Sequence, residues 1–207
     1  MSAVRPPFFF NWLSPKYLFC EIPGKEKVLY LTFDDGPVQE ATPEVLEILE
    51  RFNAKATFFV VGDNVRKHPD IFNRMIHDGH AIGNHTFHHL NGWHTAPGAY
   101  MYDVHKCREI VDSRLFRPPY GRFTPTQYFL LHKDFRFVLW SVLTRDFDRY
   151  TTPEECLKNA IDYSHNGSIV VFHDSLKAME KVRYALPKFL EHFSALGYRF
   201  SGIDKSD

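Results

Sequence analysis

Residues 29–37 read Leu29-Tyr30-Leu31-Thr32-Phe33-Asp34-Asp35-Gly36-Pro37. In this stretch an apolar run of strand-forming residues ends on two adjacent carboxylates, and Gly-Pro then stops any strand or helix. Two like charges side by side cost free energy unless a bound cation, an arginine or a retained proton offsets them. A solvated turn is the simpler interpretation. A site in which other groups offset the two charges is favoured over this turn, because the rest of the chain supplies further cation ligands and an arginine.

The composition is that of a soluble globular domain. The 207 residues are 44% hydrophobic and 24% charged, which allows one domain with a substantial core. The formal net charge is +0, so no nucleic-acid partner is expected. The 12 histidines and 16% aromatic residues fit a metal site and a surface for stacking.

Residues 1–25 are expected to form an N-terminal arm that packs on the domain formed by residues 26–207. The arm is aromatic, but it is too short and too interrupted by prolines to span a bilayer, and it lacks an export signal. Cys20, Cys107 and Cys156 have no CxxC neighbour, which favours buried or free thiols over a disulfide framework. A cytoplasmic location is the default expectation, with cell-envelope association as the alternative. The sequence does not indicate an oligomeric state.

Apolar runs alternate with helical patterns along the chain. The runs expected to form strands are 28–33, 56–61, 81–82, 115–116, 137–143, 168–172 and 198–200. Helices are expected to begin at Thr42, His68-Pro69, near residues 100 and 126, and at Thr152 and Pro187. Strands and helices at these intervals imply parallel βαβ units, in an open doubly wound sheet or in a barrel.

The positions of the reactive side chains favour the barrel. Polar groups follow strand-like runs at Asp34-Asp35, His85 to His89, 117–120, Asp146 and His173. In a parallel barrel the carboxyl ends of all strands open on one face, where such side chains converge. A doubly wound sheet would usually offer a glycine-rich phosphate loop, which this sequence lacks. Because the chain is short for eight complete units, we expect an α/β fold that is a distorted, incomplete (β/α) barrel, with its site at the C-terminal face of the strands.

The spacing of His85 and His89 indicates a metal site. On a helical turn, side chains four residues apart share one face, so two imidazoles can bind one cation. Two structural histidines are the alternative. Joined to a carboxylate from the Asp34-Asp35 pair, they form a two-histidine, one-carboxylate set that suits a hydrolytic zinc or similar divalent ion.

The remaining groups supply acid–base chemistry. The second carboxylate of the Asp34-Asp35 pair can act as a base that Arg117 keeps ionised and oriented. His173 can protonate a leaving amine or alkoxide, and Asp146 would hold its imidazole cationic. Asp148 is an alternative to Asp146 in that role.

Five sequence blocks occur in order and together carry a family resemblance. They are Thr-Phe-Asp-Asp-Gly-Pro at 32–37, Gly-His-Ala-Ile-Gly-Asn-His-Thr-Phe-His-His at 79–89, Arg-Pro-Pro-Tyr-Gly at 117–121, Leu-Trp-Ser-Val to Asp-Phe at 139–147 and Val-Phe-His-Asp at 171–174. The set resembles the polysaccharide deacetylase family (the NodB homology domain, carbohydrate esterase family 4) over roughly residues 26–203. The resemblance implies a distorted (β/α) barrel with about seven parallel strands. It also implies a metal-dependent hydrolase that removes an acetyl group from a carbohydrate.

The resemblance also assigns roles. It implies that Asp34 is the catalytic base, held by Arg117, and that His173 is the general acid, tuned by Asp146. The implied metal ligands are Asp35, His85 and His89. The backbone N–H of Tyr120 would stabilise the oxyanion. Pro119, Tyr120 and Phe147 are the substrate-binding residues expected.

The sequence departs from the family pattern at Phe147, where tryptophan is usual; a changed acetyl pocket with retained chemistry is expected. Zinc is the first expectation for the metal, with cobalt, nickel or manganese as alternatives. The substrates expected first are acetylated carbohydrates containing N-acetylglucosamine. Two other functions stay open, a hydrolase of a small non-sugar amide or ureide and a carbohydrate-binding protein without turnover. Activity is expected to fall at acid pH, because protonation of His85 and His89 competes with the metal.

Several other side chains have a structural and a functional interpretation. His80 is expected to be a structural hydrogen-bonding histidine, and His88 a surface group or a neighbour of the metal ligands. Asp174 is expected to brace the loop that carries His173. Stacking on sugar rings competes with core or rim packing for Trp93, Tyr128 and Tyr150.

Overall fold

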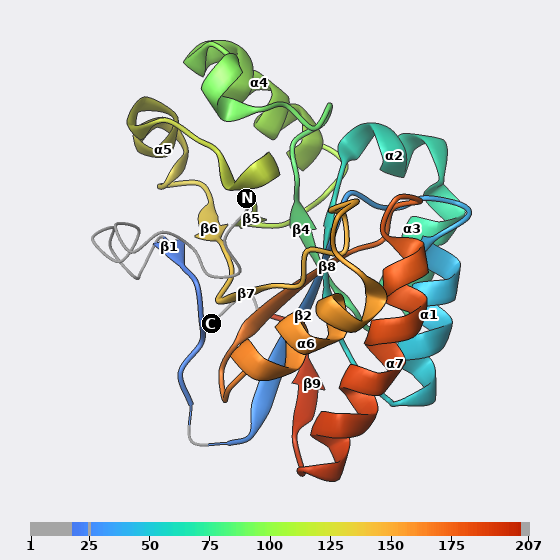
Figure 1. The fold of residues 1–207 in the computed structure, drawn as a ribbon. Coiled ribbons are helices and arrows are strands. Elements are labelled where there is room, and N and C mark those ends of the chain that lie inside the picture. Colours follow the sequence, from blue (N-terminus) through green and yellow to red (C-terminus); the bar gives the residue numbers. More distant parts are fainter. Residues whose placement is uncertain (1–17, 25, 204–207) are drawn as a thin grey trace.

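The fold is a curled sheet of parallel strands with helices packed around it (Figure 1). The computed structural model describes residues 18–24 and 26–203. Most of the predicted N-terminal arm therefore lies outside the described residues, although Leu18 and Phe19 join the sheet as a short strand. Within the described part of the chain, no helix combines the length and the apolar character needed to cross a membrane.

The strands follow the predicted order along the chain, with one addition at the start. They are β1 (Leu18–Phe19), β2 (Val28–Asp34), β3 (Thr57–Val60), β4 (Ala81–Asn84), β5 (Leu115–Phe116), β6 (Arg136–Val138), β7 (Val142–Leu143), β8 (Ile169–His173) and β9 (Arg199–Ser201). In space their order is β1-β6-β5-β4-β3-β2-β8-β7, with β9 beside β2, and each of these pairings is parallel. Among the described strands β1 and β7 are the two edges, so the distorted, incomplete barrel is confirmed, with more strands than the seven expected.

Helices connect successive strands except between β1 and β2 and between β6 and β7. They are α1 (Thr42–Arg51), α2 (Gly62–Lys67), α3 (Pro69–His77), α4 (Pro97–Arg108), α5 (Pro125–Leu131), α6 (Pro153–Tyr163) and α7 (Met179–Ala195), with short 3₁₀ turns η2 (Gly92–His94) and η3 (Pro119–Gly121). Proline at the first or second position opens α1, α3, α4, α5 and α6. Thr152 begins α6 with a capping box to Glu155, as its sequence predicts.

Two predicted elements were wrong. The run 137–143 is two strands, because the chain changes partners between them: Leu139 N–H donates to Phe19 O, whereas Ser141 N–H donates to Ile169 O. Pro187 does not begin the last helix but lies inside α7, which starts at Met179. An interior proline is costly. Here the buried side chains on both sides of it hold the helix against the sheet.

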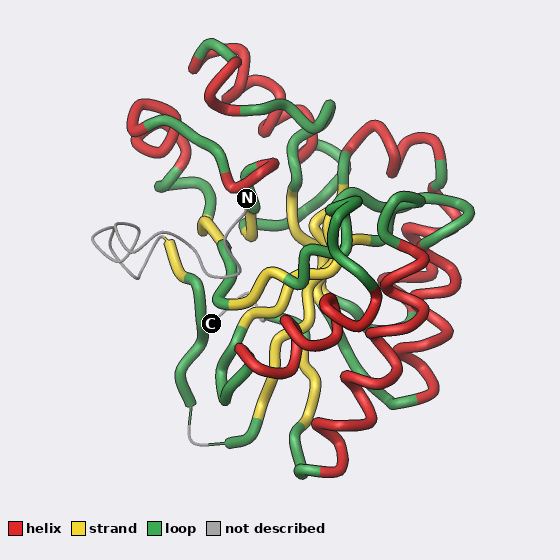
Figure 2. The backbone as a smooth tube through the Cα atoms, viewed as in Figure 1, coloured by secondary structure: helices red, strands yellow, loops and turns green. Residues whose placement is uncertain are grey.

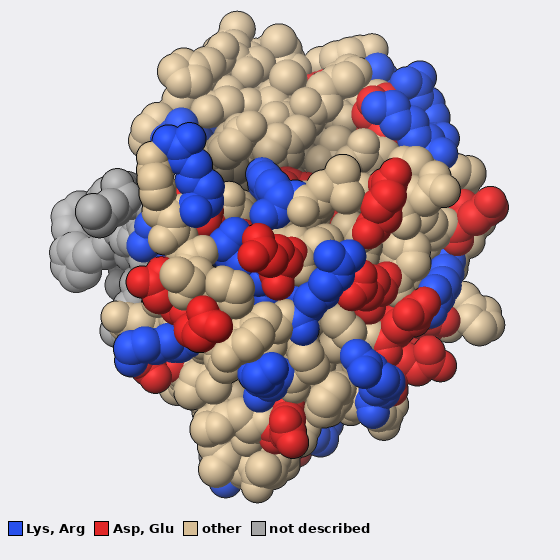
Figure 3. Space-filling model, turned by 45° about the vertical axis from the view of Figure 1, so that its right-hand side comes forward, with Lys and Arg blue, Asp and Glu red and all other residues tan. Residues whose placement is uncertain are grey.

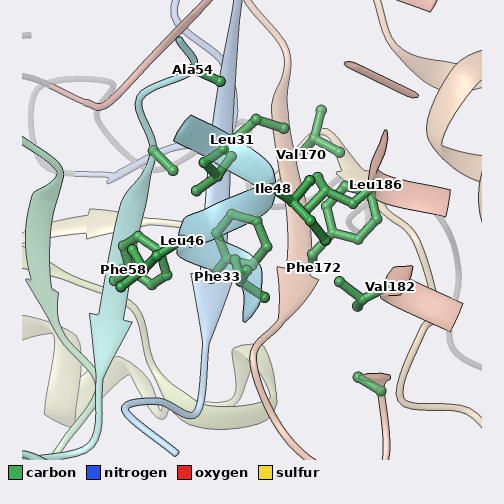
Figure 4. Close-up of a cluster of buried hydrophobic side chains, with 14 of the residues drawn as sticks. Leu31, Phe33, Leu46, Ile48, Ala54, Phe58, Val170, Phe172, Val182 and Leu186 are labelled. Carbon is green, nitrogen blue, oxygen red and sulfur yellow. The ribbon is translucent and has the colours of Figure 1, made fainter. Parts of the chain in front are cut away.

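The largest core lies between the sheet and the helices α1 and α7. Figure 4 shows Phe33 of β2 between Phe58 of β3 and Phe172 of β8. The ring of Phe33 is 5.1 Å from that of Phe58 and 6.0 Å from that of Phe172. The helices contribute Ile48 and Leu186 to the same cluster (Figure 4). This packing fixes β2 and β8, which end on Asp34 and His173, with β3 paired to the other side of β2.

The loops that leave the carboxyl ends of the strands form one end of the molecule. Figure 2 shows the strands side by side with most helices to one side of them. On the face drawn in Figure 3, basic and acidic side chains of the described residues are interspersed, and a basic group lies at the upper right. This mixture agrees with a formal net charge of +0.

Candidate active site

The carboxylate of Asp34 is held by a buried arginine. Asp34 ends β2 and is 5% exposed, and Arg117, which follows β5, is fully buried. Arg117 Nη1 donates to Asp34 Oδ1 at 2.7 Å and to Thr32 Oγ1 at 2.7 Å. The same guanidinium donates to the carbonyls of Val138 and Leu139 at 3.1 and 2.8 Å. Sequence reasoning paired Asp34 with Arg117, and the structure places them in contact.

The structure also brings Asp35, His85 and His89 together. Their ligand atoms lie within 4.8 Å of one another, and they form a cluster that can hold a metal ion. His89 Nε2 is 3.1 Å and His85 Nε2 is 3.9 Å from Asp35 Oδ1. His85 Nδ1 lies 2.7 Å from the carbonyl oxygen of Arg117, which turns Nε2 towards Asp35.

The two histidines do not lie on a helical turn, so that part of the prediction was wrong. They lie in a loop after β4, where Thr86 has φ 62° and His89 has φ 56°. These left-handed residues fold the loop back on itself, and the two rings come within 5.1 Å. Asn84 holds the bend because its side-chain oxygen accepts from Thr86 N–H at 2.8 Å.

The surroundings of Asp35 and His85 favour the deprotonated forms of these two side chains. Burial opposes ionisation of Asp35, but the hydrogen bond from His89 and the nearby imidazoles of His173 and His85 outweigh it and lower the Asp35 pKa. Burial lowers the pKa of His85 from 6.5 to about 4, although Asp34 opposes this change. A carboxylate at Asp35 and a neutral imidazole at His85 are the protonation states that bind a cation.

His173 and Asp146 form a second ion pair facing the same site. His173 ends β8, and its Nδ1 lies 2.7 Å from Asp146 Oδ1, while its backbone N–H donates to Asp146 Oδ2 at 2.6 Å. Burial opposes the charge on His173, but the carboxylate of Asp146 outweighs it and raises the pKa to about 9. The alternative partner, Asp148, contacts Arg145 at 2.5 Å and the N–H of Tyr150 instead.

The predicted substrate-binding residues lie beside these groups. Tyr120 has φ 60° within η3, and its ring is 4.8 Å from that of His89. Pro119 is buried next to it, and the ring of Phe147 is 5.0 Å from that of His173. A groove of about 430 Å³ runs past Asp35, His88, His89, Tyr120, Ser175 and Lys177. This volume is within the range of small-molecule sites.

Two side chains that support the site, Asp103 and Lys177, were not expected from the sequence. Asp103, on α4, accepts from the N–H groups of Phe87 and His88 at 2.9 Å and contacts His88 Nδ1 at 2.5 Å. Lys177 Nζ lies 3.5 Å from Asp35 Oδ2 and 6.0 Å from the Phe147 ring centroid. These contacts join residues far apart in the sequence, and no local motif marks them.

Asp174 was expected to brace the loop that carries His173. It instead braces the loop after Asp35, where it accepts from Gly36 N–H at 3.0 Å and from Thr42 Oγ1 at 2.6 Å. A Cβ on Gly36 would lie 1.9 Å from Asp174 Oδ2, so this close approach requires glycine.

The structure also places the other side chains that had both a structural and a functional interpretation. His80 is structural: its Nδ1 accepts from Ala56 N–H at 3.2 Å, and burial lowers its pKa to about 4. Tyr128 is a core residue, whereas Trp93 and Tyr150 are exposed.

Known proteins share this arrangement of elements. A sequence profile of the polysaccharide deacetylase family matches residues 21–133. The chain is 32% identical over 198 residues to a peptidoglycan-N-acetylglucosamine deacetylase of Bacillus cereus, with 91% of this chain and 92% of that protein covered. It is 37% identical over 161 residues to a chitooligosaccharide deacetylase of Azorhizobium caulinodans, with 74% and 76% covered.

The backbone of a solved structure is similar to that of this chain over nearly the whole length of both. A peptidoglycan N-acetylglucosamine deacetylase in complex with an N-hydroxybenzamide compound superimposes with a TM-score of 0.86 and 31% identity, covering 96% of this chain and 95% of that one. The chain therefore belongs to the polysaccharide deacetylase family, whose named relatives are carbohydrate deacetylases.

Proposed function

We propose that this protein is a metal-dependent hydrolase that removes an N-acetyl group from a glycan containing N-acetylglucosamine. The observation that carries the proposal is the three-ligand cluster of Asp35, His85 and His89, set between an arginine-held carboxylate and a carboxylate-held histidine. The relatives support the substrate class, since they are named as deacetylases of peptidoglycan N-acetylglucosamine and of chitooligosaccharides.

The cluster fits a divalent metal by its donor set. Two imidazole nitrogens and one carboxylate oxygen suit zinc, with cobalt, nickel or manganese as alternatives, and leave coordination positions open. The hydrogen bond at His85 Nδ1 orients that ring with Nε2 towards the cluster. A bound divalent ion would supply positive charge that polarises the acetyl carbonyl and lowers the pKa of water.

Asp34 and His173, on either side of the cluster, carry out the two proton transfers. Asp34 Oδ1 accepts from Arg117, so its second oxygen serves as the base that takes a proton from the attacking water. His173, with Nδ1 turned to Asp146, offers Nε2 to protonate the departing nitrogen. The raised pKa of His173 keeps that proton available at neutral pH.

The loop after β5 and the loop after β7 hold the acetyl group. The N–H of Tyr120, in its left-handed conformation, is the proposed donor to the oxyanion that develops from the carbonyl oxygen. Pro119 and Phe147 provide apolar contacts, with Phe147 beside the general acid His173.

Acetate release from chitooligosaccharides tests the proposal. The purified protein is assayed after chelation and again after addition of zinc or cobalt, together with Asp34→Asn and His173→Ala. Each variant should lose about 10²–10⁴-fold in kcat, the usual contribution of general acid–base catalysis. Asp148→Asn is the matched control, because Asp148 is a nearby carboxylate that contacts Arg145 and not His173.

Each outcome separates the functions that remain open. Metal-dependent release that both variants abolish supports the proposal. Tight metal binding with no cleavage of any acetylated sugar favours a small amide or ureide as the substrate. Sugar binding without metal, and without any effect of Asp34→Asn, indicates a carbohydrate-binding protein.

A further inference from the structure

Trp93 is a large apolar side chain that the fold leaves in solvent. It lies in η2, four residues after His89, and is 61% exposed. An indole has a large apolar surface, so exposing it forgoes burial worth roughly 25 cal/mol per Å². Among the described residues its ring contact is with Arg122, whose Cζ lies 4.7 Å from the ring centroid.

The backbone under Trp93 is held firmly. Asn91 Oδ1 accepts from Trp93 N–H at 3.0 Å. The buried amide of Gln127 donates to the carbonyls of Gly92 and Thr95 at 2.9 and 3.0 Å. The backbone of the turn is therefore fixed under the ring, which lowers the entropy cost of binding a ligand there.

Two short segments of chain link Trp93 to the candidate active site. The first is the chain itself, from His89 to Trp93. The second runs through η3: the ring of Tyr120 is 4.8 Å from that of His89, and Arg122 follows two residues later. The two turns are packed together, since a Cβ on Gly92 would lie 2.4 Å from Arg122 O.

The chemistry of this surface matches a sugar ring. Sugars have flat faces of C–H groups that pack on aromatic rings, and hydroxyl groups that accept hydrogen bonds. The guanidinium of Arg122 lies over one face of the Trp93 ring and brings N–H donors to that face. An apolar platform with a few polar donors at its rim is the usual composition of a small-molecule site.

We propose that Trp93 and Arg122 form a subsite for a sugar that neighbours the one being deacetylated. The inference rests on the proposed function and deepens it. It predicts that the substrate is an oligosaccharide or polymer, and that a single N-acetylglucosamine unit is hydrolysed much less efficiently. Tyr120 connects the two in the chain, since its ring contacts that of His89 and Arg122 follows it by two residues.

The test compares chitin oligosaccharides of one to five units on the zinc-loaded protein. The measured quantity is the ratio of kcat/KM for the tetramer to kcat/KM for the monomer. Trp93→Ala should lower this ratio about tenfold, the effect of losing one stacked ring, and Trp93→Phe should restore most of it. Tyr102→Ala is the control, because Tyr102 is an exposed ring on α4 outside both subsites. Unfolding midpoints confirm that each variant is folded.

A binding measurement keeps the subsite distinct from the catalytic proposal. The affinity of chitotetraose for Asp34→Asn is measured by calorimetry, with and without Trp93→Ala. If Trp93→Ala weakens chitotetraose binding but the native sequence shows no turnover, the subsite stands and the proposed function is rejected. If the protein is active but Trp93→Ala leaves the tetramer-to-monomer ratio of kcat/KM unchanged, the proposed function stands and the subsite is rejected. The absence of both binding and turnover overturns both.

Discussion

Arg117 places a guanidinium in the interior with no exposure, beside the carboxylate of Asp34. Burial lowers the Arg117 pKa, and the charge and hydrogen bond of Asp34 oppose that change. Removing one partner of a buried ion pair leaves an uncompensated charge, which costs about 3–5 kcal/mol. We therefore expect Arg117→Met to lower the free energy of unfolding by about that amount and to abolish activity, as measured by urea denaturation and acetate release.

The double variant distinguishes charge from packing. Asp34→Asn in the Arg117→Met background removes the unpaired carboxylate, so the double variant should be more stable than Arg117→Met alone. An equal or lower free energy of unfolding would mean that lost packing on the Phe59 ring, 4.1 Å from the guanidinium, causes the effect.

The pKa of His173 sets a limit on activity at high pH. The folded-state pKa of about 9 lies above the ordinary value of 6.5. The bound proton therefore stabilises the folded state fully below pH 6.5, and this stability is lost as the pH rises through about 9. The imidazolium is also the proposed acid, so kcat/KM should fall above about pH 9.

Asp146→Asn tests the cause of that limit. Without the carboxylate, burial alone acts on His173, and the upper limit of the pH profile should move below 9 towards or past 6.5. The change is followed by the pH dependence of kcat/KM and by NMR titration of the His173 ring. An upper limit that stays near 9 in this variant would assign it to another group.

At the scale of elements, the loop 85–89 depends on α4. Asp103 accepts two backbone N–H groups of this loop, and each buried donor left unpaired costs about 1–3 kcal/mol. Asp103→Ala should weaken zinc binding about 10–100-fold, because it releases the loop that orients His89. Zinc affinity is measured by competition with a chelator.

Asp103→Asn is the matched variant, since its amide oxygen can still accept from the backbone. It should retain most of the zinc affinity that Asp103→Ala loses. If Asp103→Ala lowers the free energy of unfolding but leaves zinc affinity unchanged, Asp103 supports the fold and not the metal ligands.

The elements differ in how far the sequence predicts them. β2, β3 and β8 are apolar runs with polar ends, and α6 carries its own capping box, so local patterns suffice. The division of 137–143 into β6 and β7 depends on which strands lie on either side, which no local pattern records. The left-handed residues Thr86 and His89 lie in a loop that α4 holds: Asn84 Nδ2 donates to Val104 O, and Asp103 accepts from Phe87 N–H. Because these partners are distant in the sequence, the loop could not be distinguished from a helical turn by spacing alone.

At the scale of the whole molecule, parallel topology assembles the site. Asp34, Arg117 and His173 are far apart in the sequence, yet each follows or ends a strand, and the sheet brings those ends together. This is why the cluster could be predicted once a parallel sheet was expected. The supporting contacts of Asp103, Asp174 and Lys177 come from helices and loops, whose approach to the site depends on tertiary packing.

The same topology predicts that metal binding stabilises the whole fold. Asp35 follows β2, and His85 and His89 follow β4, with β3 between these strands. A metal bound there would link two strand ends that the unfolded chain keeps apart. Zinc at 100 times its Kd should therefore raise the free energy of unfolding by about 2.7 kcal/mol, provided the unfolded chain binds it weakly. The measurement is urea denaturation of chelated and zinc-loaded protein. His89→Ala should lose this increase, whereas His94→Ala, which removes an exposed histidine outside the cluster, should keep it. An increase that survives His89→Ala would place the zinc elsewhere, and a decrease in the native sequence would show that zinc prefers the unfolded chain.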